Sequence, residues 1–181
     1  MEFEKIKNLI EFFFKNPYIE IHLRDLSRRL KLSPYATKIY VDYLIKNKLI
    51  LEDKRANLRY LKANMQNILF RKLKLVYSIS LISKSGLLDY FYKESQKISS
   101  IVLFGSVARA EDDNNSDIDL VIIGAKKDLD LSEYEKKLKK EINLHSFSWG
   151  DWHKQYKSNN AFYSDVIIHG ISLYGDLPLI S

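Results

Sequence analysis

Apolar and polar positions recur with helical spacing along the first third of the chain. In residues 3–15 an apolar side chain returns every three or four positions, with lysine and glutamate between, which predicts an amphipathic helix. Asn16 and Pro17 end this helix, because proline cannot donate the next backbone hydrogen bond. The pattern then predicts an extended piece at 18–21, helices at 22–31 and 34–47, and strands at 49–52 and 58–61.

The third of these helices has a clear start. Ser33 suits the N-cap position and Pro34 suits the first helical position. The order of helix, strand, helix, turn, helix and hairpin resembles a winged helix-turn-helix domain, and residues 30–34 and 43–50 are similar to segments of MarR-type regulators. Lys48 stands where such domains carry glycine, so we expect the neighbouring Asn47 to adopt the left-handed backbone.

The pattern changes in the rest of the chain. Residues 64–97 predict two helices, broken near 83–86, that are apolar on more than one face and therefore buried between domains or in a dimer seam. Further on, apolar runs and period-two alternation predict strands at 101–104, 118–123 and 141–147, helices at 128–140, 149–158 and 161–169, and a closing strand near 171–176. We therefore expect an α/β (α+β) protein with a winged helix-turn-helix domain at 1–63, connecting helices at 64–97 and a mixed-sheet domain at 98–181.

A possible phosphate site follows the first strand of the mixed-sheet domain. A strand that runs into Gly105 and Ser106 and then into a helix leaves backbone N–H groups free to bind an anion. Gly105 permits close approach, Ser106 adds a hydroxyl donor, and Arg109 lies one helical turn further on. A glycine–serine corner is common, so this feature alone favours a structural role.

A possible metal site follows eleven residues later. Asp117 and Asp119 are two positions apart on a predicted strand, so their carboxylates project from the same face. Converging carboxylates repel each other unless a cation lies between them, and hard oxygen ligands select Mg²⁺ or Mn²⁺. Surface pairs of this kind are also frequent, and the pair alone does not decide the function.

Together, Phe-Gly-Ser-Val-Ala-Arg-Ala-Glu at 104–111 and Ser-Asp-Ile-Asp-Leu at 116–120 resemble the motif of the minimal nucleotidyltransferases, a branch of the polymerase-β-like superfamily. The resemblance implies that Asp117 and Asp119 bind Mg²⁺ or Mn²⁺. It also assigns Gly105, Ser106, Arg109 and Ser116 to a nucleoside triphosphate, with ATP as the expected one. Because some members act as antitoxins, a protein acceptor or a toxin-like partner is a further expectation.

One expected feature of the family is missing. Active members usually place a third carboxylate on a later strand, but the polar face of residues 141–147 offers only Asn143 and His145. Asn143 would complete a metal shell weakly, and His145 is a candidate base or metal ligand, although a lone strand histidine is more often structural. Trp149, Trp152 and Tyr156 are candidates for stacking on a nucleobase, with core packing as the competing interpretation.

The charge is distributed unevenly. The net charge of +6 divides into +6 for residues 1–63, +4 for 64–100 and −4 for 101–181. This asymmetry is compatible with a basic surface that faces double-stranded DNA. A surface that is merely solvated explains it equally well. The winged-helix resemblance implies base contacts from Tyr35, Lys38 and Ile39, and phosphate contacts from Arg24, Arg28, Lys54 and Arg55.

The composition narrows the protein class further. The chain has 181 residues and no cysteine, which excludes a disulfide framework and a thiolate metal site. Apolar runs are far shorter than the roughly 18 residues of a membrane helix, and the first residues do not resemble an export signal. We expect a soluble, cytoplasmic protein. Two hypotheses stay open: a metal-dependent nucleotidyltransferase fused to a DNA-binding domain, or a DNA-binding regulator whose second half binds nucleotide or a partner without catalysis.

Overall fold

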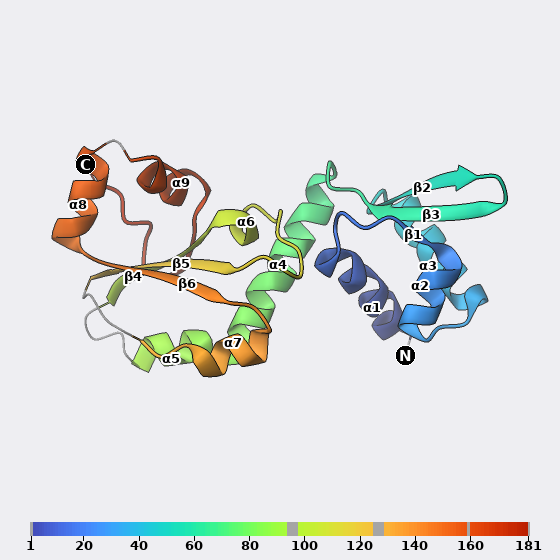
Figure 1. The fold of residues 1–181 in the computed structure, drawn as a ribbon, viewed down its shortest axis with the longest axis horizontal. Coiled ribbons are helices and arrows are strands. Elements are labelled where there is room, and N and C mark those ends of the chain that lie inside the picture. The colour runs from blue at the N-terminus through green and yellow to red at the C-terminus, as the bar shows by residue number, and fades with distance from the viewer. Residues whose placement is uncertain (1, 94–97, 125–128, 159, 181) are drawn as a thin grey trace. The chain divides into compact units, whose positions relative to one another are not determined.

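The computed structural model describes residues 2–93, 98–124, 129–158 and 160–180. The chain forms two compact units, Met1–Tyr77 and Ser78–Ser181 (Figure 1). Helix α4 (Ile68–Ser85) contains the boundary between them. In the described part of the chain, no helix is both long enough and apolar enough to cross a membrane.

The first unit has the predicted order of elements. They are α1 (Glu2–Lys15), β1 (Ile21–His22), α2 (Leu23–Leu30), α3 (Pro34–Lys46), β2 (Ile50–Arg55) and β3 (Leu58–Ala63), followed by the start of α4. The strands form an antiparallel sheet in the order β1-β3-β2. The hairpin is longer than predicted, because Asp53, Lys54 and Arg55 pair with β3 instead of forming the tip.

The core of this unit lies between its helices and its sheet. Phe13, Leu26 and Leu61 are completely buried in one cluster. The predicted apolar stripe of α3 is confirmed, since Thr37, Tyr40, Val41 and Leu44 are all buried. The predicted start of α3 is also confirmed, because the Ser33 hydroxyl accepts a hydrogen bond from the Ala36 amide at 3.2 Å.

The backbone after α3 corrects one expectation. Lys48 itself is left-handed, with φ of 58°, whereas Asn47 has φ of −86°. The Asn47 side chain donates to the Tyr43 carbonyl at 2.8 Å, which keeps that residue close to helical geometry. The side chains of Asn64 and Asn67 both donate to the Lys48 carbonyl, at 2.8 and 3.0 Å. These bonds offset a left-handed cost of about 1–2 kcal/mol at Lys48.

The second unit is built on a four-stranded sheet. Its elements are α5 (Leu87–Lys93), β4 (Ile98–Phe104), α6 (Gly105–Ala108), β5 (Ile118–Gly124), α7 (Ser132–Leu138), β6 (Ile142–Ser148), α8 (Trp149–Lys157), α9 (Ala161–His169) and β7 (Ile171–Tyr174). The strand order is β6-β5-β4-β7, with β5 and β6 parallel and the other pairs antiparallel. This mixed sheet confirms the predicted α/β (α+β) class. The predicted break between α4 and α5 is confirmed at Gly86. Residues 94–97 of the predicted connecting helices and residue 128 of the helix predicted at 128–140 lie outside the described residues.

Helices cover both faces of this sheet, with α5 and α7 on one side and α8 and α9 on the other (Figure 1). Leu103 and Leu120 belong to the core on the α5 and α7 side. Val102 and Val121 belong to the core on the α8 and α9 side. Because side chains alternate along a strand, Asp119 shares its face with Val121, two positions on. The candidate carboxylates therefore lie on the α8 and α9 side of the sheet.

Candidate nucleotidyltransferase site

The two candidate metal ligands converge on one side chain of the neighbouring strand. Asp119 lies in β5 directly opposite Asn143 in β6, and Asp117 comes just before β5. The amide nitrogen of Asn143 donates to Asp117 Oδ2 at 3.2 Å and to Asp119 Oδ1 at 3.1 Å. One oxygen of each carboxylate is therefore within hydrogen-bond distance of the same point.

Gly105 has a structural reason to be glycine. Its φ is +68°, and a Cβ atom there would lie 2.1 Å from Asp119 Oδ2 and 3.0 Å from Asp119 Cγ. The missing side chain leaves the space that the Asp119 carboxylate occupies beside Phe104, its partner in β4. The glycine was predicted for close approach to a phosphate, but in this structure it makes room for a carboxylate.

The helix after Gly105 is shorter than the phosphate-site argument assumed. Helix α6 has four residues, and its first two carbonyls accept local hydrogen bonds: the Arg109 amide donates to the Gly105 carbonyl and the Glu111 amide donates to the Ser106 carbonyl. A single turn has a small dipole, so the helix itself contributes little to anion binding. Ser106 is only partly buried and can still offer its hydroxyl.

The guanidinium of Arg109 is bound to two carboxylates. It donates to Asp165 in α9 at 2.9 and 3.2 Å, and to Glu111 at 3.1 Å. The hydrogen bond that Arg109 donates to Glu111 raises the pKa of Arg109 above its usual value, so the side chain stays charged. Arg109 thus connects the end of α6 to α9. Its guanidinium contacts Asp165 and Glu111 instead of Asp117 and Asp119.

Ser116 is engaged within its own loop. Its hydroxyl lies 2.9 Å from the amide of Asp113 and 3.1 Å from the Asp113 carboxylate. The amide of Asn115 also donates to that carboxylate, at 2.9 Å. These bonds make a tight turn immediately before Asp117.

The predicted candidates further along the sheet divide into exposed and buried side chains. His145 is exposed in β6, and its ring packs against Phe104 and Phe162 with centroids 5.7 and 5.1 Å apart. Trp152 is completely buried, which confirms core packing for that residue. Trp149 and Tyr156 are each 44 % exposed.

The donor set is consistent with an Mg²⁺ or Mn²⁺ ion held partly by the nucleotide. Among the described residues, no group of three or more His, Asp or Glu side chains could hold a metal ion. Mg²⁺, however, is usually bound by one or two carboxylates together with substrate phosphates and water. Asp117 and Asp119 supply such a pair, and one oxygen of each lies within hydrogen-bond distance of the Asn143 amide.

The candidate DNA-binding residues lie on the surface of the first unit. Tyr35 and Ile39 of α3 are 76 % and 47 % exposed, and Lys38 is exposed between them. Arg24 and Arg28 line a groove of about 500 Å³ together with Lys31, Ser27, Leu32 and Pro34.

The basic side chains of this surface are partly neutralised. Arg28 forms an ion pair with Asp25, and Lys54 lies 3.9 Å from Glu52. Arg55 donates to both carboxylate oxygens of Glu20, and this bond raises the pKa of Arg55 above its usual value.

Two contacts near the site have no signal in the sequence. Asp165 was not predicted to meet Arg109, 56 positions earlier. Lys140 was assigned to a charged helix, yet its ammonium binds the turn before Asp117. A single sequence cannot reveal such pairs, because the partners lie far apart and belong to common residue types.

Comparison with known proteins agrees with the sheet and its carboxylate motif. A family model described as "Polymerase beta, Nucleotidyltransferase" matches residues 86–176, which is half of the chain. No curated protein matches. A solved toxin–antitoxin structure with AMP-PNP is 21% identical with a TM-score of 0.36, and covers 50% of this chain and 71% of its own. A mutant of the toxin–antitoxin MntA-HpeT is 19% identical with the same TM-score and the same coverage. On the family match, the chain belongs to the polymerase beta nucleotidyltransferase family.

Proposed function

We propose that the protein transfers a nucleoside monophosphate from a nucleoside triphosphate, with ATP the expected one, to an acceptor hydroxyl at the Asp117–Asp119 pair. The acceptor oxygen would bond to the α-phosphorus while the bond to the β-phosphate breaks, pyrophosphate leaves, and the hydroxyl proton passes to a base, for which His145 is the candidate. The observation that carries this proposal is the convergence of both carboxylates on the Asn143 amide. The family match supports the same reaction class.

Each residue of the site has a distinct role in this proposal. Asp117 and Asp119 would hold Mg²⁺ or Mn²⁺, which neutralises charge on the triphosphate and on the leaving pyrophosphate. Ser106 would donate its hydroxyl to a phosphate, and Gly105 keeps the Asp119 carboxylate in place. Arg109 and Ser116 stay candidates for phosphate contacts, although each already has partners within the protein.

The site assignment can be tested by removing both charges. Asp117→Asn together with Asp119→Asn should keep the fold, because Asn has the shape of Asp, but should abolish Mn²⁺-dependent binding of ATP. Calorimetry with ATP, with and without Mn²⁺, measures this directly. Equal ATP affinity in the wild type and the double variant would disprove the assignment.

A second candidate function is nucleotide binding without transfer. Asn143 is one of the two polar residues on the strand that the family resemblance assigns to the third carboxylate, and an amide cannot activate an attacking hydroxyl as a base. His145 stays a candidate base, since it lies two positions further along the same face of β6. Pyrophosphate release from each NTP separates the two functions. Asn143→Asp should raise the release rate if only the third carboxylate is missing.

For the first unit we propose a winged helix-turn-helix domain that binds double-stranded DNA, with α3 in the major groove and the β2–β3 hairpin as the wing. The exposure of Tyr35, Lys38 and Ile39 supports this proposal. Lys54→Ala with Arg55→Ala should weaken binding to every duplex and flatten the salt slope by up to about 2, near 0.9 per lost phosphate contact. Lys38→Ala should instead reduce discrimination between sequences.

The competing role for the same surface is recognition of a protein. A second copy of the chain, a protein acceptor and a toxin-like protein are the partners to consider. Gel shifts with random and self-operator duplexes at two salt concentrations decide between these roles. Absence of any DNA binding at low salt would end the DNA proposal, because a domain with a net charge of +6 and a true recognition helix binds DNA at least non-specifically.

A further inference from the structure

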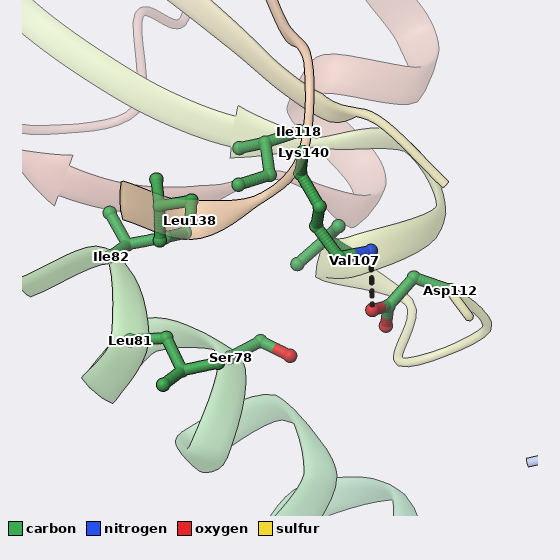
Figure 2. Close-up of a pocket in the computed structure, with 8 residues that line it drawn as sticks. All are labelled: Ser78, Leu81, Ile82, Val107, Asp112, Ile118, Leu138 and Lys140. Atoms are coloured by element: carbon green, nitrogen blue, oxygen red, sulfur yellow. Dashed lines mark ion pairs between the residues drawn. The ribbon is translucent and has the colours of Figure 1, made fainter. Parts of the chain in front are cut away.

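Lys140 lies between the start of β6 and the loop that precedes Asp117. It comes two residues before β6, and its side chain extends toward the loop that leads into Asp117 (Figure 2). Only 18 % of this side chain is exposed. A lysine normally keeps its ammonium in water, so this degree of burial requires specific partners.

The ammonium of Lys140 has three such partners in the loop. It donates to the backbone carbonyl of Asp113 and to that of Ser116, the latter at 2.8 Å. It also lies 3.6 Å from the carboxylate of Asp112, a residue that is only 5 % exposed. Figure 2 shows this ion pair at the rim of a pocket whose other walls come from Ser78, Leu81, Ile82, Val107, Ile118 and Leu138.

The pocket beside Lys140 favours the contacts between its ammonium and the loop. Its volume is about 30 Å³, which admits roughly one water molecule. Most of its walls are apolar, so an ammonium that left the loop would find few alternative acceptors there. Hydrogen bonds in such a weakly polar setting are stronger than the same bonds in water.

The lysine bonds have a direct consequence for Asp117. Its neighbour on one side, Ser116, is held by Lys140, and its neighbour on the other side, Ile118, donates its amide to the Glu141 carbonyl at 2.9 Å. Lys140 and Glu141 are consecutive residues that lead into β6. The same strand carries Asn143, which bonds to the Asp117 carboxylate. The approach to β6 thus holds the backbone on both sides of Asp117, while the strand itself holds its side chain.

We propose that Lys140 is a positioning residue, which sets the Asp117 carboxylate beside that of Asp119 by tying the 112–116 loop to the start of β6. This role rests on the proposed nucleotidyl transfer, because positioning matters only if the two carboxylates act together. Lys140 itself touches neither carboxylate of the pair among the contacts that the structure describes.

Lys140→Met tests the proposal, because methionine keeps the apolar stem and removes the ammonium. Two measurements are needed. NMR of the Asn143 side-chain amide, without metal or nucleotide, reports whether both carboxylates still accept its hydrogen bonds. Calorimetry with Mn²⁺ and AMP-PNP reports the affinity of the site, which should fall by about tenfold or more, as for other groups that orient metal ligands.

Three further variants separate positioning from folding. Lys136→Met removes an exposed lysine of α7 and should change neither measurement. Lys140→Arg keeps the charge and the donors, and should recover most of the affinity. Asp112→Asn with Lys140→Met removes both charges of the buried ion pair together, so this double variant stays folded if the single one does not, and it should lose the same affinity.

The outcomes distinguish the two proposals. Asn143 amide signals that are unchanged in the Lys140→Met protein, or in the double variant, would overturn the positioning role. Changed Asn143 signals in a protein whose wild type binds no AMP-PNP would uphold the positioning role and refute the proposed function. A loss of affinity in Lys136→Met equal to that in Lys140→Met would also overturn the positioning role.

Discussion

The β2–β3 hairpin of the first unit, which we propose to be a wing, and the carboxylate pair of the second unit differ in how far their charges are compensated. In the wing, Arg55 donates to both oxygens of Glu20, at 2.7 and 2.8 Å, and to Asp53 at 2.8 Å. In the pair, Asp117 and Asp119 share one neutral amide, and among the residues that the structure describes neither has a lysine or arginine nitrogen within 4.0 Å. One region compensates its charges and the other leaves them uncompensated.

This difference indicates which charges stabilise the fold and which are available to bind a ligand. Exposed ion pairs contribute at most about 1 kcal/mol each, so the wing can exchange them for other partners at little cost. One oxygen of each carboxylate lies within 3.2 Å of the Asn143 amide nitrogen, and like charges held close together repel each other even in water. A fold that keeps such a repulsion without a local benefit indicates a binding site, since departures from local consistency concentrate at functional sites.

The largest expected effect comes from disturbing the carboxylate pair through the backbone. Gly105→Ala should reduce the free energy of unfolding by about 1–3 kcal/mol, because the left-handed residue would carry a Cβ atom. That atom would lie 2.1 Å from Asp119 Oδ2, so the carboxylate must move and Mn²⁺-dependent nucleotide binding should be lost. Chemical denaturation and calorimetry measure the two effects.

Gly150→Ala is the matched control for this substitution. A Cβ atom at Gly150 in α8 would meet only the Ser148 hydroxyl oxygen, at an ordinary 3.8 Å. Alanine in that helix should increase stability by up to about 1 kcal/mol and leave nucleotide binding unchanged. Wild-type nucleotide affinity in Gly105→Ala would show that the position of the Asp119 carboxylate does not matter for binding.

A smaller effect is expected when the compensation in the wing is removed. Glu20→Gln should remove one of the two carboxylates that Arg55 contacts, so the net charge around Arg55 rises by one. Duplex DNA should then bind more tightly at low salt, and the slope of log affinity against log salt should steepen by up to about 0.9. Gel shifts at several salt concentrations give this slope.

Glu4→Gln is the control for the overall change in charge. Glu4 is exposed on α1 and its replacement changes the net charge by the same amount. If the wing contacts phosphate, only Glu20→Gln steepens the slope. An equal change in both variants would mean that the net charge of the protein, and no contact by Arg55, controls binding.

The two regions also differ in what their sequences reveal. The carboxylate pair could be predicted because Asp117 and Asp119 are two positions apart, and a strand of period two places them on one face. The order of elements in the first unit was predictable for a similar reason, since Ser33 and Pro34 carry their own start signal. Local spacing determines both features.

Features that depend on distant partners were not predictable. The left-handed residue was expected at Asn47, but two asparagines from residues 64–67 stabilise it at Lys48. The wing was expected to offer Arg55 to phosphate, and its pairing with Glu20, 35 positions earlier, has no signature in the sequence. Lys140 and Asp112 meet in the same way, through a strand and a loop that only the fold brings together.

A still smaller effect on the free energy of unfolding is expected when one carboxylate of the Asp117–Asp119 pair is removed. Asp119→Asn should leave the free energy of unfolding unchanged or raise it by up to about 1 kcal/mol, because the repulsion from Asp117 disappears. The new amide can still accept through its oxygen from Asn143, so no hydrogen bond need be lost. Thermal and chemical denaturation without metal test this expectation. A loss above about 1 kcal/mol would mean that the Asp119 charge stabilises the fold.

The smallest expected effect concerns the loop that precedes the pair, and it appears as a dependence on pH. The hydrogen bond from the Asn115 amide lowers the pKa of the Asp113 carboxyl below its usual value. A carboxyl whose pKa is lower in the folded state stabilises the fold above its unfolded pKa of about 3.9, and this contribution is lost as the pH falls through the folded pKa. Asp113→Asn lacks the titrating group, so its deficit in unfolding free energy relative to wild type should be constant above about pH 5 and should narrow below pH 4. Denaturant unfolding of both proteins between pH 6 and the lowest pH at which they remain folded measures this difference, and a deficit that stays the same at every pH would show that the Asp113 charge contributes nothing to the turn.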